Sequence, residues 1–256
     1  MVTIIKTEFM KLKRYFIVWI GVSLMLLTVL LTLFTTMADD EMVWDYQFLF
    51  EQVVKHFVTM IFPMCITLIS GYMISREYTD DTLKNIETLP ISFRKLLAGK
   101  LIVSAILSFF LGIVCFAFTV VANFIMGYDG FALIPALTGL VQMALLGFFL
   151  YLTMLPIIVL TSRYKGSFLV GVIVAFVYGF IGMFANGTLQ SIYPVSAALG
   201  LINYRAGAEG VMWNKGLCFI SILIMCAIGI ALMFVKQKPE KREAKKTQHT
   251  APKKGW

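Results

Sequence analysis

The Gly99-Lys100 pair is the first candidate for chemistry in this sequence, because a Gly-Lys pair closes the phosphate-binding loop of many nucleotide hydrolases. That loop also needs a serine or threonine directly after the lysine, and another glycine five positions before the glycine of the pair. In this chain Leu101 follows Lys100, and Arg94 occupies the earlier position. No other Gly-Lys pair occurs in the 256 residues. The sequence therefore predicts no nucleotide-hydrolysing loop of this kind.

Side chains that could serve as acids, bases or metal ligands are scarce where a membrane enzyme would need them. The long apolar segments contain no Asp, Glu, Lys, Arg or His, and His56 and His249 each stand alone. The four cysteines lie inside apolar segments without a CxxC pair, so they predict neither a disulfide framework nor a zinc site. Ionisable groups within a span are functional by default. Their absence argues against an intramembrane enzyme and against a proton- or ion-coupled transporter.

The most patterned polar stretch runs from Arg76 to Lys100, between two apolar segments. It contains three residues that favour helix N-caps, followed by apolar residues three positions apart: Asp80, Asp81 and Thr82, then Leu83, Ile86 and Leu89. Pro90 disfavours helix at the residue before it, and Ser92 caps a second helix that continues into the next apolar segment. The pattern predicts a short amphipathic helix over residues 82–89. Such a helix is too short to be stable alone, so we expect it to pack against a cytoplasmic partner.

The elements that must position this segment are membrane-spanning helices. The chain is 59% hydrophobic and only 14% charged, whereas soluble domains carry about 25% charged residues. Apolar blocks of this length cross roughly 30 Å of hydrocarbon as helices. We expect an all-α integral membrane protein with six transmembrane helices: 16–37, 57–75, 101–126, 136–162, 167–184 and 217–235. The first is longer than the apolar core of a cleaved signal peptide, so we expect it to be retained.

The lysines and arginines divide unevenly between the two sides that these spans define. Nineteen of the 22 fall on the side that holds both termini and the 76–100 segment, and three fall on the other side: Lys55, Arg205 and Lys215. Basic residues concentrate on the cytoplasmic side of membrane proteins. The distribution predicts that both termini and the 76–100 segment are cytoplasmic. The net charge of +8 then reflects topology and contact with anionic lipid, and we expect no nucleic-acid partner.

Two terminal segments flank the predicted transmembrane domain, residues 16–235. In residues 1–15, apolar residues recur on one helical face: Val2, Ile5, Phe9, Leu12 and Phe16. This predicts an amphipathic helix in the cytoplasmic interface of the membrane; the alternative is a basic leader that only sets topology. Residues 236–256 are lysine-rich with almost no apolar content, which predicts a basic, disordered cytoplasmic tail.

Two longer segments lie on the predicted outer side. Residues 37–56 are acidic and are interpreted as a solvated loop; the alternative is a loop that recruits a cationic ligand. Residues 185–214 are moderately apolar and contain Pro194. We expect two short helices separated near Pro194 that dip back into the outer leaflet; an ordinary extracellular loop is the alternative.

Residues 76–100 resemble the cytoplasmic loop of ABC transporter type-2 permeases, whose usual pattern is close to E-R/Y-x-x-G-T-L-E-x-L-x-x-T-P-I-S-R-x-x-L-L-x-G-K. The matching stretches are Arg76-Glu77, Thr82-Leu83, Leu89-Pro90-Ile91-Ser92 and Gly99-Lys100. The six spans, the N-terminal helix and the long outer segment before the last span are also similar to that family. Asp81 stands where the family commonly has glycine, so the turn into the short helix is expected to differ.

The resemblance implies that the 82–89 helix is a coupling helix, which docks in a groove of a separate ATPase subunit. It implies ATPase contacts at these residues: Asp81, Thr82, Leu83, Lys84, Ile86, Glu87 and Leu89. Arg76 and Glu77 would couple the loop to the membrane edge; the alternative for Glu77 is a surface charge paired with Arg76. No cofactor is expected in this chain, because ATP and Mg²⁺ would be bound by the ATPase.

Six-span permeases of this size resemble the lantibiotic-immunity and bacitracin-resistance exporters. The resemblance implies a permease subunit in the bacterial cytoplasmic membrane, assembled with a second permease copy or paralogue and two ATPase copies. The expected substrate is hydrophobic or amphipathic, an antimicrobial peptide or toxin moved out of the cell or membrane. Small drugs or ions are alternative cargoes, and a non-transporting membrane sensor or scaffold is the alternative function.

Overall fold

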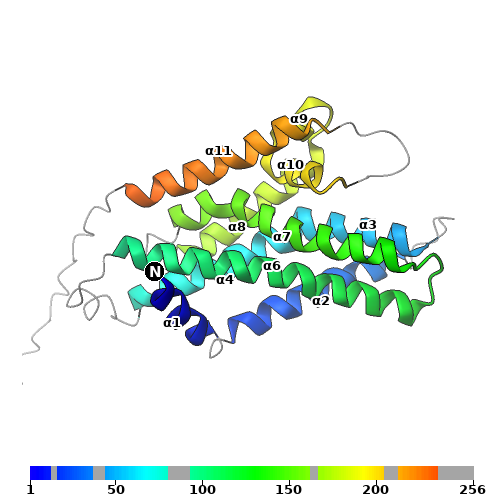
Figure 1. Ribbon diagram of the computed structural model, residues 1–256, viewed down its shortest axis with the longest axis horizontal. Coiled ribbons are helices and arrows are strands. Elements are labelled where there is room, and N and C mark those ends of the chain that lie inside the picture. The colour runs from blue at the N-terminus through cyan, green and yellow to red at the C-terminus, as the bar shows by residue number, and fades with distance from the viewer. Residues whose placement is uncertain (13–15, 37–43, 80–92, 162–166, 205–212, 236–256) are drawn as a thin grey trace, which may run out of the picture.

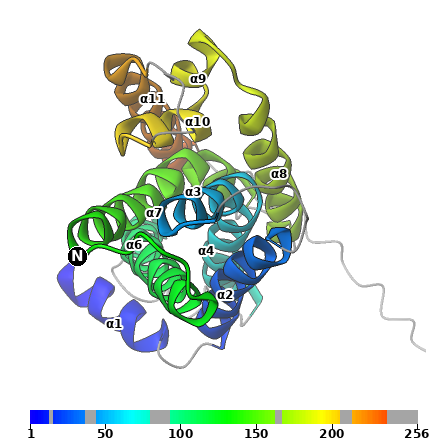
Figure 2. The same cartoon turned by 90° about the vertical axis from the view of Figure 1, so that its right-hand side faces the viewer.

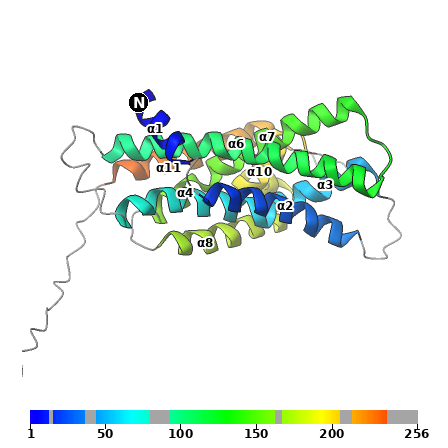
Figure 3. The same ribbon diagram turned by 90° about the horizontal axis from the view of Figure 1, so that it is seen from below.

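Figure 1 shows the computed structural model, which describes residues 1–12, 16–36, 44–79, 93–161, 167–204 and 213–235. Every regular element within these residues is a helix. In chain order they are α1 (Val2–Leu12), α2 (Ile17–Thr35), α3 (Tyr46–His56), the π-helical turn η1 (Phe57–Ile61), α4 (Phe62–Thr79), α6 (Phe93–Met126), α7 (Leu133–Thr161), α8 (Phe168–Ile181), the 3₁₀ turn η2 (Gly182–Phe184), α9 (Thr188–Ile192), α10 (Pro194–Leu201) and α11 (Lys215–Phe234). The long helices run side by side along one axis (Figures 1 and 3). The predicted all-α membrane class is confirmed.

Five helical stretches are long and apolar enough to cross a membrane: Ile17–Thr35, Tyr46–Arg76, Arg94–Met126, Leu133–Thr161 and Lys215–Phe234. Each corresponds to one of the predicted spans. The remaining prediction, 167–184, is met by a shorter apolar helix, Phe168–Phe184, formed by α8 and η2. A count of six full spans therefore stays a prediction.

Helix α3 shows that the predicted solvated loop over 37–56 was wrong for residues 46–56. Asp45 caps the helix, because its carboxylate accepts a hydrogen bond of 2.7 Å from the Phe48 amide. Leu49, Val53 and Val54 are fully buried. Helix α3 continues through η1 into α4, and this continuous helix lies at the centre of the bundle, surrounded by α2, α6, α7 and α8 (Figure 2).

The π-helical turn η1 lies just before Pro63. A proline has no amide hydrogen, so the Thr59 carbonyl lacks the helical partner that residue 63 would otherwise supply. Gly179 of α8 packs against this carbonyl: a Cβ atom at Gly179 would lie 2.8 Å from the Thr59 oxygen. A small residue at this position lets α8 approach the central helix closely, as is common between membrane helices.

Helices α6 and α7 pack through two reciprocal glycine contacts. A Cβ atom at Gly112 of α6 would lie 2.5 Å from the Met143 carbonyl oxygen of α7. A Cβ atom at Gly147 of α7 would lie 2.6 Å from the Ser108 carbonyl oxygen of α6. Both distances are too short for real side chains, so the two backbones meet directly at this crossing.

The predicted break near Pro194 is confirmed. Helix α9 ends at Ile192, and Pro194 is the first residue of α10, where its missing amide hydrogen costs nothing. The Ser221 hydroxyl of α11 donates to the Ile192 carbonyl at 2.6 Å, which ties this segment to the last helix. Helices α9 and α10 lie at the end of the bundle opposite α1 (Figure 1); their depth in a membrane stays a prediction.

Candidate functional site

The predicted coupling segment connects the end of α4 to the start of α6. Residues 80–92 lie outside the described residues, so the predicted ATPase contacts stay predictions: Asp81, Thr82, Leu83, Lys84, Ile86, Glu87 and Leu89. The two helices that flank the segment are in contact two to three turns away from it, since the Ser104 hydroxyl of α6 donates to the Met73 sulfur of α4 at 4.0 Å. Helix α6 begins at Phe93, which confirms that the helix predicted after Ser92 runs into the third span.

Arg76 and Glu77 lie in the last turn of α4. The Arg76 guanidinium donates to the Tyr72 hydroxyl, one turn earlier, at 3.5 Å. The side chain of Glu77 is outside the described residues. Its predicted role at the membrane edge and the alternative pairing with Arg76 therefore both stay predictions.

Helix α1 packs on the first turns of α6 through a buried ion pair. The Glu8 carboxylate lies 2.7 Å from the Lys100 ammonium and 2.9 Å from that of Lys11. Only 1% of Glu8 and 2% of Lys100 is exposed. A carboxylate and an ammonium can be buried together because each neutralises the other and satisfies its hydrogen bonds.

Helix α1 also has a buried face, which the sequence did not predict. The apolar stripe was predicted to face the membrane, and its members Val2 and Phe9 are exposed, whereas Glu8 and Leu12 are buried. Gly99 of α6 makes room for this approach, since a Cβ atom there would lie 2.7 Å from the Ile4 side chain. Sequence analysis missed the pairing because it depends on a contact across 92 residues, which no local pattern reports.

The end of the last helix lies at the same end of the bundle. The Arg94 guanidinium donates to the Phe234 carbonyl at 3.4 Å and lies 5.5 Å from the centre of the Phe234 ring. Helix α1, the start of α6 and the end of α11 therefore share one end, together with the last turn of α4 (Figure 1). We call this the basic end, because Lys6, Lys11, Arg76, Arg94, Lys95 and Lys100 all belong to it.

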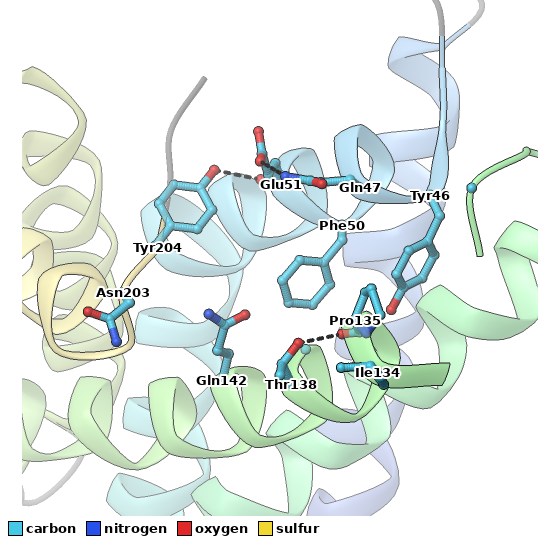
Figure 4. Close-up of a pocket in the computed structure, with 12 residues that line it drawn as sticks. Tyr46, Gln47, Phe50, Glu51, Ile134, Pro135, Thr138, Gln142, Asn203 and Tyr204 are labelled. Carbon is cyan, nitrogen blue, oxygen red and sulfur yellow. Dashed lines mark hydrogen bonds between the residues drawn. The ribbon is translucent and has the colours of Figure 1, made fainter. Parts of the chain in front are cut away.

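The opposite end holds a cavity of about 420 Å³ between α3, α7 and the turn after α10. We call it the outer pocket (Figure 4). It is lined by Tyr46, Gln47, Phe50, Glu51, Gly130, Ile134, Pro135, Thr138, Gly139, Gln142, Asn203 and Tyr204. A second cavity of about 350 Å³ lies on the other side of α3 and shares Glu51 and Tyr204 with it. Sequence analysis missed both, because it treated residues 46–56 as loop.

The described part of the chain holds no candidate metal site. It contains no group of three or more His, Cys, Asp or Glu residues arranged to hold a metal ion. Cys65, Cys115, Cys218 and Cys226 are all free thiols. Gly99 and Lys100 of the Gly-Lys pair lie within α6, where they pack against α1.

Comparisons with known proteins identify the family of the chain. Residues 4–182 match the family model described as ABC-2 family transporter protein. The chain is 25% identical over 169 residues to the bacitracin transport permease protein BCRB of Bacillus licheniformis; this covers 66% of the chain and 79% of that protein. No solved structure matches this chain. The family match extends from α1 to the end of α8 and covers most of the chain, which therefore belongs to the ABC-2 family of transporter proteins.

Proposed function

We propose that this chain is the membrane-spanning permease subunit of an ATP-driven exporter, in which a separate ATPase subunit hydrolyses ATP. The observation that carries the proposal is which two helices flank residues 80–92 in the chain. They connect the central helix, Tyr46–Thr79, to α6, a second helix of the same length. Both helices extend from the basic end to the outer pocket end (Figure 1).

A force applied to residues 82–89 would therefore act on two long helices at once. Helix α6 has 34 residues, or about 50 Å at 1.5 Å per residue. The buried pair of Glu8 and Lys100 fixes α1 to the first turns of α6. Closure of an ATPase dimer on the coupling segment would thus move α1, α4 and α6 together. This movement would change how the helices pack at the other end of the bundle.

A second permease chain completes this proposal. We propose a homodimer or a pair with a paralogue, with two ATPase copies at the basic end and both termini in the cytoplasm of a bacterial cell. The basic end would then face anionic lipid headgroups, as membrane topology favours.

The proposed cargo is an antimicrobial peptide or toxin, moved outward. Two points support this choice: similarity to a protein described as a bacitracin transport permease, and a bundle interior that is mainly apolar within the described residues. Small drugs or ions are the alternative cargoes. A membrane sensor or scaffold would show neither ATP-dependent transport nor an ATPase partner.

The experiment measures vanadate-sensitive ATP hydrolysis in the complex purified from its host with a tag on this chain and reconstituted in lipid. Leu83→Asp and Ile86→Asp place a charge on the apolar face of the predicted coupling helix and should abolish peptide-stimulated hydrolysis. Leu133→Asp is the matched control, because Leu133 is exposed in the first turn of α7, where an acidic residue is tolerated. Unchanged hydrolysis in the Leu83 and Ile86 variants, or purification without any ATPase, would refute the proposal.

A further inference from the structure

The outer pocket has walls that are fixed by hydrogen bonds between separate elements. The Tyr204 hydroxyl donates to the Glu51 carbonyl of α3 at 2.9 Å. The Gln142 side-chain amide of α7 donates to the Ile202 carbonyl at 2.9 Å. Asn203 has a left-handed backbone with φ of 55°, which asparagine tolerates. These bonds hold α3, α7 and the turn after α10 around the same space, so the cavity is a built feature of the fold.

A buried hydroxyl in this wall has no partner among the residues that the structure describes. Only 3% of Tyr46 is exposed, and its hydroxyl oxygen makes no hydrogen bond within the described residues. Figure 4 shows the ring at one side of the pocket, with the hydroxyl directed toward Ile134 and Pro135. A buried hydroxyl without a partner costs free energy. A ligand with a hydrogen-bond acceptor at this position would remove that cost.

The remaining polar groups of the pocket indicate the kind of ligand. Glu51 is the one charged side chain among the described residues that line it, and its carboxylate accepts from the Gln47 amide at 3.3 Å. Gln142 commits its nitrogen to Ile202, and its oxygen faces the pocket (Figure 4). The lining thus offers a carboxylate, an amide acceptor and a hydroxyl donor beside the aromatic ring of Phe50. This combination repels phosphate headgroups and suits a cation that carries amide groups.

We propose that the outer pocket binds a segment of a cationic peptide, with a protonated amine against the Glu51 carboxylate and a peptide carbonyl on the Tyr46 hydroxyl. A peptide amide hydrogen then donates to the Gln142 oxygen. The volume of about 420 Å³ lies within the roughly 300–1,000 Å³ typical of ligand pockets. The inference that this peptide is the exported cargo rests on the proposed function; binding itself does not.

The experiment measures peptide binding to the full-length chain in nanodiscs of neutral lipid, by fluorescence polarisation, with empty nanodiscs subtracted. The probe is a labelled tripeptide amide that contains one lysine. Two matched peptides replace the lysine with norleucine or glutamate. The lysine peptide should bind at least about tenfold more tightly than the norleucine peptide, and the glutamate peptide should bind least.

Variants of the pocket residues test whether the outer pocket causes the preference for the lysine peptide. Glu51→Gln should reduce affinity for the lysine peptide to the norleucine level, and Tyr46→Phe should weaken all binding about threefold to tenfold. Asp129→Asn is the control, because it removes an exposed charge at the same end without altering the pocket, and it should leave affinity within about twofold. Equal binding of the three peptides, no binding, or an unchanged preference in Glu51→Gln would overturn the proposal. Because no ATPase or nucleotide is present, these outcomes are independent of the hydrolysis test.

Discussion

Glu8 and Lys100 form an ion pair of 2.7 Å that is almost completely shielded from solvent. The pair joins the first helix of the chain to the first turns of α6, next to the residues that we propose contact the ATPase. In the mechanism that we propose, helix α1 would therefore move with the start of α6. An interfacial anchor bound to lipid alone would not need a buried salt bridge.

Removal of one member of this pair should destabilise the protein strongly. Glu8→Leu leaves the Lys100 ammonium buried without its carboxylate, and Lys100→Met does the reverse; each should cost about 3–5 kcal/mol. The double variant removes both charges, so much of this stability should return. Thermal unfolding in detergent measures the stability of all three variants.

Lys11→Met is the control for this prediction. Lys11 also contacts Glu8, but 39% of its side chain is exposed, so its loss should cost less than about 1 kcal/mol. A double variant that is as unstable as the two single variants combined would contradict the pairing.

The close crossing of α6 and α7 should not accept a side chain at Gly112. Gly112→Leu places atoms where the Met143 carbonyl lies, and we expect a loss of about 1–3 kcal/mol or failure to fold. Ala117→Leu places the same side chain at an exposed position of α6 and should change stability by less than about 0.5 kcal/mol. Size-exclusion chromatography and thermal unfolding compare the two. Equal behaviour would show that the backbones do not meet at this crossing.

Loss of the hydroxyl should affect the stability of the protein differently at two buried tyrosines. Tyr151 donates to the Leu101 carbonyl at 2.8 Å, so Tyr151→Phe should cost about 1–2 kcal/mol of unfolding free energy. The Tyr46 hydroxyl has no partner within the described residues, so Tyr46→Phe should leave the ligand-free protein as stable or slightly more stable. Thermal unfolding without ligand tests this. A clear loss of stability in Tyr46→Phe would mean that the hydroxyl is used by the fold itself.

The two ends of the bundle should label differently in intact cells. Lys95 lies exposed at the basic end and Lys215 lies exposed at the start of α11, at the opposite end. With the native cysteines replaced by alanine, Lys215→Cys should react with a membrane-impermeant maleimide in intact cells. Lys95→Cys should react only after the cells are opened, because basic residues favour the cytoplasmic side. The reverse pattern would invert the proposed topology.

The helices that the sequence predicts best are those with continuous apolar patterns and clear ends. Pro194 marked the break between α9 and α10, and Ser92, an N-cap type, marked the start of α6 at Phe93. The break and the start of the helix were both confirmed. Helix α3 was missed because the acidic residues of 37–56, Asp45 and Glu51 among them, suggested a solvated loop. The signal was nevertheless present: Asp45 caps the helix, and Leu49, Val53 and Phe57 repeat at helical spacing on its buried face.

The candidate sites were harder to predict for a physical reason. The short helix over 82–89 follows from local caps and spacing, and it lies outside the described residues. The Glu8 and Lys100 pair and the outer pocket each depend on residues from distant parts of the chain. Their side chains are polar and common at surfaces, so composition alone suggests solvation. Only the packing of α1 on α6, and of α3 beside α7, gives these residues their buried or enclosed positions.

The π-helical turn at Phe57–Ile61 separates Glu51 from α4 in the central helix. Each residue of an α-helix advances the chain by about 100°, and a π turn introduces one extra residue. The wider π turn absorbs its extra residue, so deleting one residue there would restore a regular α-helix and leave Glu51 facing nearly the same way. The same deletion in the α-helical stretch between Glu51 and the turn would instead rotate Glu51 by about 100° relative to α4. The acidity of the outer pocket thus tolerates the loss of a residue at the π turn but not in the helix just before it.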